Sequence, residues 1–244
     1  REKGDHFKMK FKGGCSDRRD ISVVDDVVRT SVLMGFPTIS RWGKLANCPG
    51  VNIDCSGLKG PGTLADGTPY DNKMHVNRCL AIAAEMMNVV LFNELRNKRG
   101  LVYGISFGYR PFKLSESGFC TISFQPKNEQ VEESVESVKS TLKQIIAEGF
   151  SEADFEGARQ PLITRCREAD VSNSFWLLLM EHLQNELSPK DISSIKKVPE
   201  HYEVITLDMV NEAVKTCYGH SLDNMAFTMG RSGPKEEDGA PKSE

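Results

Sequence analysis

Apolar residues recur at three- and four-residue steps between residues 76 and 95, which is the spacing of a helix with one buried face. The stripe ends at residues 97–100. There Lys98 and Arg99 suit the negative end of a helix dipole, and Gly100 suits a left-handed C-terminal cap. From residue 101 to 109 the apolar period changes to about two residues, as in a β-strand. The pattern therefore predicts a long helix that leads directly into a strand.

The same reading of periodicity predicts the other elements of the chain. Residues 42–72 are an exception, because they hold six Gly and three Pro among few apolar residues, and here we expect a long irregular loop. Gly35 and Pro37 are expected to break one strand, and Pro161 to bend one helix. The expected strands are 6–12, 27–39, a hairpin over 101–125, and 224–229. The expected helices are 131–146, 151–163, 173–187, a short one from 188, and 207–218.

Strand pairs followed by helix pairs predict an α+β fold, in which a two-layer domain has a largely antiparallel sheet covered by helices on one face. Residues 173–187 are nearly apolar on all sides, so we expect this helix to be buried. One domain is expected over residues 1–230, including the loop at 42–72. Residues 231–244 are polar and rich in Pro and Gly, which predicts a disordered tail.

Composition excludes several classes of function. The net charge is -3 and the cations are mixed with acidic residues, so no basic surface is expected to hold nucleic acid. No apolar run approaches the roughly 20 residues that cross a bilayer, so no membrane span is expected. The seven cysteines are odd in number and scattered, which favours reduced thiols over a disulfide scaffold or a zinc site. Only Cys48 and Cys55, which lie within one loop, are placed to pair.

Two residues at the junction of the long helix and the strand carry candidate chemistry. Arg96 falls in the last helical turn and Tyr103 early in the strand, so both side chains can project toward one surface. A guanidinium fork and a phenol are donors suited to the backbone carbonyls of an extended peptide, or to the oxyanion of one being cleaved. The alternative is a surface cation at a helix end and a tyrosine packed in a sheet, and spacing alone favours that alternative.

Metal and nucleophile chemistry find little support in the sequence. The five histidines are isolated, and one imidazole cannot hold a catalytic zinc, which needs several protein ligands. Glu181 and His182 form the end of an H-x-x-E-H metallopeptidase motif, but Leu178 stands where the first His belongs, so His182 is expected to be a partly buried helix residue. A Cys–His nucleophile pair stays open, because its members need not be adjacent in sequence.

Residues 92–103, FNELRNKRGLVY, resemble the R-x6-Y segment in the C-terminal, non-catalytic halves of the M16 zinc metallopeptidases. This is the family of insulysin, pitrilysin and the mitochondrial processing peptidase. Residues 28–43, 173–184 and 190–205 are most similar to the C-terminal region of the stromal processing peptidase branch of that family. The resemblance runs over most of the chain, from about Val28 to Tyr218.

The resemblance implies a LuxS/MPP-like metallohydrolase fold and a partner. Family members pair two related α+β halves into a clamshell, and zinc lies on an H-x-x-E-H helix of the N-terminal half. Residue by residue, Arg96 and Tyr103 would reach the scissile region, hold its carbonyl and stabilise the tetrahedral intermediate. No zinc ligand carries over, so the resemblance implies that this chain holds no metal and that zinc belongs to the partner half. The long loop at 42–72 resembles an insertion relative to the family.

The leading hypothesis is therefore a zinc-free half of an M16-type metalloendopeptidase that is inactive alone. Its expected partners are a zinc-bearing half, in the same polypeptide or a separate subunit, and an unfolded or presequence-like peptide. An organellar, plastid stroma-like location follows from the resemblance only, and a secretory compartment stays open. The alternative is a catalytically silent structural, peptide-binding or assembly domain. A third hypothesis is an independent Cys–His hydrolase.

Overall fold

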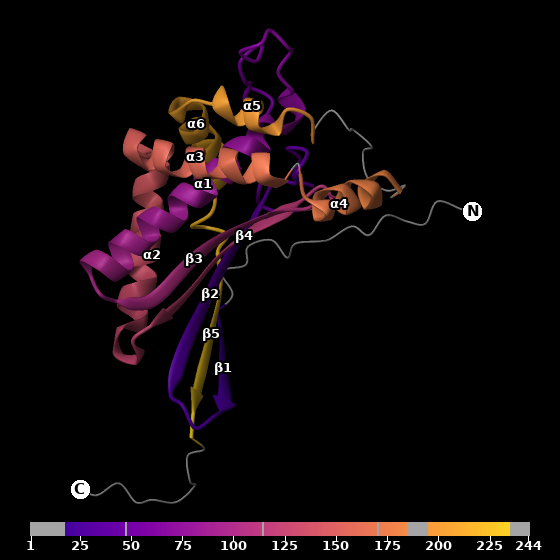
Figure 1. Ribbon diagram of the computed structural model, residues 1–244. Helices are drawn as coiled ribbons and strands as arrows, with labels where there is room; N and C mark the ends of the chain where they lie inside the picture. Colours follow the sequence, from indigo (N-terminus) through magenta and orange to yellow (C-terminus); the bar gives the residue numbers. More distant parts are fainter. Residues whose placement is uncertain (1–17, 47, 114, 170, 185–194, 235–244) are drawn as a thin grey trace, which may run out of the picture.

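The computed structural model describes residues 18–234, apart from residues 47, 114, 170 and 185–194. Its centre is a five-stranded sheet in the order β1-β5-β2-β4-β3 (Figure 1). Strand β1 runs parallel to β5, and the other neighbours are antiparallel, so the prediction of a largely antiparallel sheet is confirmed. The strands are β1 (Arg18–Val24), β2 (Arg29–Thr38), β3 (Val102–Pro111), β4 (Gly118–Pro126) and β5 (Ala226–Gly233).

Helices α1, α2, α3 and α6 form a layer over one face of the sheet, which gives the predicted two-layer α+β architecture (Figure 1). Helix α1 is the centre of this layer, because it contacts β3 of the sheet as well as α3 and α6. The helices are α1 (His75–Phe92), α2 (Val131–Glu148), α3 (Glu152–Ala169), α4 (Asn173–Gln184), α5 (Val198–Glu203) and α6 (Leu207–Tyr218). Shorter turns of helix cover Asn72–Met74, Asn93–Lys98 and Asn128–Gln130.

The core lies between the sheet and the helical layer. Strand β2 shows why, because buried and exposed residues alternate along its first half, as expected for a strand with one covered face. Met34 and Phe36 of this strand are buried, and they belong to one apolar cluster with Ile122 of β4 and Leu80 of α1. The opposite face of β2 presents Ser31 and other exposed side chains.

Two glycines end helical segments, and one serine begins a helix. Gly100 has φ of +62°, and the N–H of Leu101 donates to the carbonyl of Leu95 at 2.9 Å, a bond that closes the end of the helical segment after α1. Gly149, with φ of +82°, follows α2 in the same way. The Ser151 hydroxyl accepts from the N–H of Asp154 at 3.3 Å and so caps α3.

Strand β2 continues through Gly35 and Pro37, so the prediction that these residues break it is wrong. The register explains the tolerance, because β5 pairs with β2 only as far as Gly35 and Ala226. The missing N–H of Pro37 therefore costs no bond to β5. Nε2 of His220 lies 2.9 Å from the carbonyl oxygen of Pro37, so this carbonyl has a hydrogen-bond partner.

Two strand predictions need correction. Strand β1 occupies a segment for which no element was predicted, and all seven of its residues are exposed, so no buried apolar period marks it. Strand β5 continues to Gly233, beyond the predicted end at residue 229 and into the predicted disordered tail, because β1 and β2 both pair with it there. The predicted strand at 6–12 and the short helix from residue 188 lie outside the described residues.

Helix α4 forms as predicted but is not buried. Leu177 is 66% exposed and Met180 is 57% exposed, and Figure 1 shows α4 to one side of the helical layer. The apolar period predicts a helix correctly, but burial depends on whether a neighbouring layer is available to cover it. The side chains of Leu178 and His182 lie outside the description, so the expectation for His182 is not tested.

The loop at 42–72 is irregular, as predicted, with turns and one isolated bridge between Thr63 and Pro69. The base of the loop is tied to two helices. The Tyr70 hydroxyl is 3.0 Å from Nδ1 of His75 at the start of α1, and the N–H of Asp71 donates to Nε2 of His201 in α5 at 3.2 Å. The loop is thus part of the folded domain.

Candidate functional site at the junction of α1 and β3

Tyr103 lies at the end of the sheet where β3 begins and β4 ends. The pairing of β3 with β4 shifts register between Val102 and Ile105, and this irregularity places Tyr103 outside the regular ladder. Its side chain is 67% exposed, which contradicts the alternative in which this tyrosine packs within the sheet. A bulge beside an exposed aromatic residue is a common way to aim a side chain at a ligand.

Tyr103 lines a groove of about 330 Å³. The start of β2 also lines the groove, and there the Thr30 hydroxyl donates to Oδ1 of Asn128 at 2.7 Å. Peptide-sized grooves that combine a phenol, an amide and backbone groups can hold an extended chain. The other lining residues are Val28, Arg29, Gln125, Pro126, Lys127 and Glu129.

Arg96 lies in the segment Asn93–Lys98, where the backbone widens from an α-helix into a π-helical turn. Such turns are rare and are frequent at functional sites. The Arg96 side chain is exposed, and its Cζ lies 4.9 Å from the centre of the Phe92 ring. Stacking on Phe92 orients the guanidinium without using its N–H donors. Arg96 is not among the residues that line the Tyr103 groove.

Arg96 differs from the other charged side chains of this turn in its ion pairing. Glu94 accepts from Lys98 Nζ at 2.8 Å and pairs with Arg99 at 3.0 Å, and these hydrogen bonds, that from Lys98 first, lower the pKa of Glu94. Arg99 also donates to the hydroxyl of Ser137 at 3.1 Å. Within the described part of the chain, Arg96 has no carboxylate within ion-pair distance. Its donors are therefore available to a ligand.

Asn88 of α1 holds the helix against β3. Its side-chain oxygen accepts from the N–H of Phe107 at 2.7 Å, and its amide nitrogen donates to the Phe107 carbonyl at 3.0 Å. Strand β3 is the edge of the sheet, so this pair satisfies backbone groups that a further strand would otherwise use. Asn88 thus fixes the strand that carries Tyr103 relative to the helix that leads to Arg96. Asn88 does not change the apolar pattern that predicts the helix, so the sequence analysis did not identify its contact with β3.

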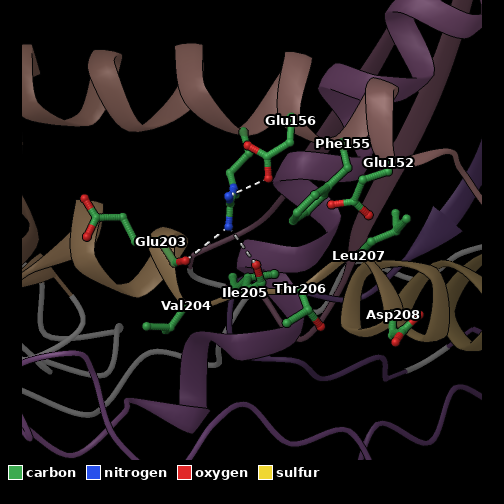
Figure 2. Close-up of a pocket in the computed structure, with 10 residues that line it drawn as sticks. Glu152, Phe155, Glu156, Glu203, Val204, Ile205, Thr206, Leu207 and Asp208 are labelled. Atoms are coloured by element: carbon green, nitrogen blue, oxygen red, sulfur yellow. Dashed lines mark hydrogen bonds and ion pairs between the residues drawn. The ribbon is translucent and has the colours of Figure 1, made fainter.

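A second pocket lies between α3 and the turn that joins α5 to α6 (Figure 2). Arg159 crosses it and donates to the carbonyls of Glu203 and Ile205 at 3.1 and 3.2 Å, and to Glu156 at 2.5 Å. These bonds use the terminal nitrogens of Arg159 to hold the turn in place. The pocket therefore has a structural role, and sequence reasoning did not identify it.

A buried Cys–His contact tests the hydrolase hypothesis. Cys79 Sγ is 3.8 Å from Nε2 of His75. Burial raises the pKa of Cys79 to about 12, and burial followed by the nearby charge of Arg78 lowers the pKa of His75 to about 4. At neutral pH the two side chains are therefore an uncharged thiol and an uncharged imidazole. This contact does not provide the activated thiolate that a cysteine nucleophile requires.

Cys48 and Cys55, the one pair that the sequence placed close enough to join, are not linked in the structure. No disulfide joins these two residues, and Cys55 instead lies 3.7 Å from Cys217 of α6, measured between the sulfur atoms. Sequence proximity suggested Cys48, but the fold brings α6 against the loop. Over the part of the chain that is described, no three His, Cys, Asp or Glu side chains are close enough to share a metal ion.

Two solved structures have a fold similar to that of this chain. The inactive domain of a peptidase M16 protein from Pseudomonas fluorescens has a TM-score of 0.63 and 16% identity, over 91% of this chain and 45% of that one. The periplasmic protease PqqL from Escherichia coli has a TM-score of 0.63 and 14% identity, over 91% and 21% of the two chains. The chain therefore shares its fold with these two proteins.

Sequence comparison points to the same group of proteins. Residues 64–162 match the family model of the peptidase M16 inactive domain. The chloroplastic stromal processing peptidase of Pisum sativum is 25% identical over 78% of this chain and 16% of its own length. That of Oryza sativa subsp. indica is 29% identical over 53% of this chain and 10% of its length. The matches thus span less than a fifth of these relatives. No helix in the described ranges has the length and apolar character to cross a membrane.

Proposed function

We propose that this chain is the zinc-free half of an M16-type metalloendopeptidase. It closes a chamber against a zinc-bearing half, binds unfolded polypeptide, and presents Arg96 and Tyr103 to the scissile carbonyl. Residues 1–230 would form this half, with the amendment that the described strand β5 continues to Gly233. The zinc would be held by the partner half, in the same polypeptide or in a separate subunit.

The observation that carries the proposal is the exposed Tyr103 on an irregular segment of β3, seven residues after an Arg96 that has no ion-pair partner in the described structure. Two hydrogen-bond donors on one short segment suit a carbonyl oxygen that gains negative charge during cleavage. The groove beside Tyr103 gives an extended peptide a place to lie. In the assembled enzyme the zinc would polarise the scissile carbonyl, while Arg96 and Tyr103 orient the peptide and donate to its oxygen.

A catalytically silent domain is the alternative, and one observation favours it. Arg96 stacks on Phe92 and does not line the Tyr103 groove. For the two donors to act on one carbonyl, the guanidinium of Arg96 has to reach a substrate that lies in the Tyr103 groove. If it does not, the chain would bind peptide or stabilise an assembly without a part in catalysis.

The location proposed for the protein is organellar. It rests on the similarity to stromal processing peptidases that are described as chloroplastic. Detection of the tagged protein by cell fractionation tests this proposal, and a secretory location would contradict it.

Substitution of the two donors tests the proposed role. In the assembled enzyme, Arg96→Ala and Tyr103→Phe should each lower kcat by about 10- to 1,000-fold, the range for loss of one oxyanion donor, with a smaller effect on KM. The matched control is Lys98→Ala, which removes an exposed cation of the same turn that is already paired with Glu94. Its kcat should stay within about twofold of the parent, as for a surface ion pair. Unchanged turnover in both donor variants would leave the silent domain as the better account.

A further inference from the structure

Two thiols from distant parts of the chain meet beside the long loop. Sγ of Cys55 lies 3.7 Å from Sγ of Cys217, although 162 residues separate them in sequence. Cys55 belongs to the loop at 42–72, and Cys217 lies in the last turn of α6. A disulfide needs the sulfur atoms at about 2 Å, so the two atoms have to approach by a further distance of under about 2 Å to bond.

The two thiols differ in their access to solvent. Cys55 is half-buried and lines an open groove of about 490 Å³, together with Trp42, Leu58 and Asn72. Cys217 lies behind it and is fully buried. A small molecule in the groove therefore meets Cys55 first.

The two thiols also differ in acidity. The hydrogen bond from Cys217 lowers the pKa of Cys55, whereas that contact and burial raise the pKa of Cys217. The thiolate is the reactive form of cysteine, so Cys55 is the attacking thiol and Cys217 is placed to react second. The buried Cys79 and Cys120 lack this arrangement, because burial raises the pKa of each to about 12.

We propose that Cys55 and Cys217 form a redox modification site that takes small aliphatic disulfides. The Cys55 thiolate attacks one sulfur of the small disulfide, whose S–S bond breaks and releases one small thiolate, which takes up a proton from solvent. Cys217 then attacks Sγ of Cys55, the S–S bond to the small molecule breaks, and the departing small thiolate takes up the proton that Cys217 loses. In sum, two protein thiols are oxidised to one disulfide, and one small disulfide is reduced to two thiols.

The new bond would fix the middle of the loop to α6. The far part of the loop is already tied toward α5, because Lys197 Nζ lies 2.5 Å from Asp66 Oδ2 and 2.7 Å from the Thr68 hydroxyl. The oxidised protein therefore holds the loop at one point more than the reduced protein. This proposal does not depend on the peptidase role.

Peptide mapping by mass spectrometry tests the proposal. The 244-residue chain is treated with oxidised glutathione under native conditions, its remaining thiols are alkylated, and the digest is mapped. We expect a linked peptide pair that joins Cys55 to Cys217 with the loss of two hydrogen atoms, and its separation on reduction. The control Cys166→Ser should give the same linked pair, because Cys166 lies on α3 outside this contact.

Two variants separate the steps. Cys217→Ala should retain glutathione on Cys55 as a mixed disulfide, because no thiol is left to displace it. Cys55→Ser should show neither an adduct nor a link at Cys217. The proposal is overturned if the unsubstituted chain keeps both thiols reduced, or links Cys55 to another cysteine. It is also overturned if Cys217→Ala holds no glutathione. The map of the unsubstituted chain decides the matter even if the core variant folds poorly.

Discussion

Single residues at the junction of α1 and β3 show how far sequence can locate a site. The change of apolar period predicts where Tyr103 stands, because a helix must end before a strand begins. Its exposure depends instead on the register shift after Val102, which arises from pairing with β4 and leaves no local signal. The stacking of Arg96 on Phe92 likewise depends on the π-helical turn, which the α-helical period does not predict.

His75 should make stability depend on pH. Its pKa is lowered from 6.5 to about 4 in the folded protein, mainly by burial. Between these values the unfolded chain binds a proton that the folded chain does not, so stability is greatest above pH 6.5 and falls as the pH drops toward 4. The expected loss from this residue is about 3 kcal/mol, the order of free energy that a shift of this size represents.

Urea unfolding at a series of pH values measures this loss. The matched variant is His75→Gln, which keeps an acceptor near the Tyr70 hydroxyl but does not titrate. It should show a shallower fall in stability below pH 6.5 than the parent, although His201 and His220, whose pKa values burial also lowers, retain part of the dependence. An equal fall in parent and variant would contradict the assignment to His75.

At the scale of elements, periodicity predicted most helices and the central strands, and it failed where tertiary context decides. Strand β1 is exposed on every residue and exists because β5 offers it an edge. Helix α4 has the apolar character of a core helix but lies beside the helical layer. Pro37 stays within a strand because the pairing of β2 with β5 stops at Gly35. In each case the neighbouring element, absent from any local window, determines the outcome.

Asn88 should be a main link between α1 and β3. Asn88→Ala removes two hydrogen bonds and leaves the N–H and carbonyl of Phe107 without them, so it should destabilise the domain by roughly 1–3 kcal/mol. Hydrogen exchange at the Phe107 amide should accelerate by about tenfold or more, in line with that loss. The control is Asn97→Ala, whose amide donates only to the exposed Asn93 and should cost under about 0.5 kcal/mol. Unchanged exchange at Phe107 would show that Asn88 does not hold this edge.

At the scale of the whole molecule, the two-layer α+β class was predictable because strands and helices are grouped along the chain rather than alternating. The contact of Cys55 with Cys217 was not, since it joins a loop to a helix 162 residues away. The same limit applies to the function proposed here. The chain matches 16% of the length of the pea relative, so its sequence alone does not test the proposed pairing with a zinc-bearing half.

Cleavage of an unstructured fluorogenic peptide tests the central claim most directly. The chain is assayed alone, together with its zinc-bearing partner half, and together with that half in the presence of a chelator. The account predicts cleavage only by the two halves together, and its loss with the chelator. Cleavage by this chain alone would contradict the account, as would full activity of the zinc-bearing half without it.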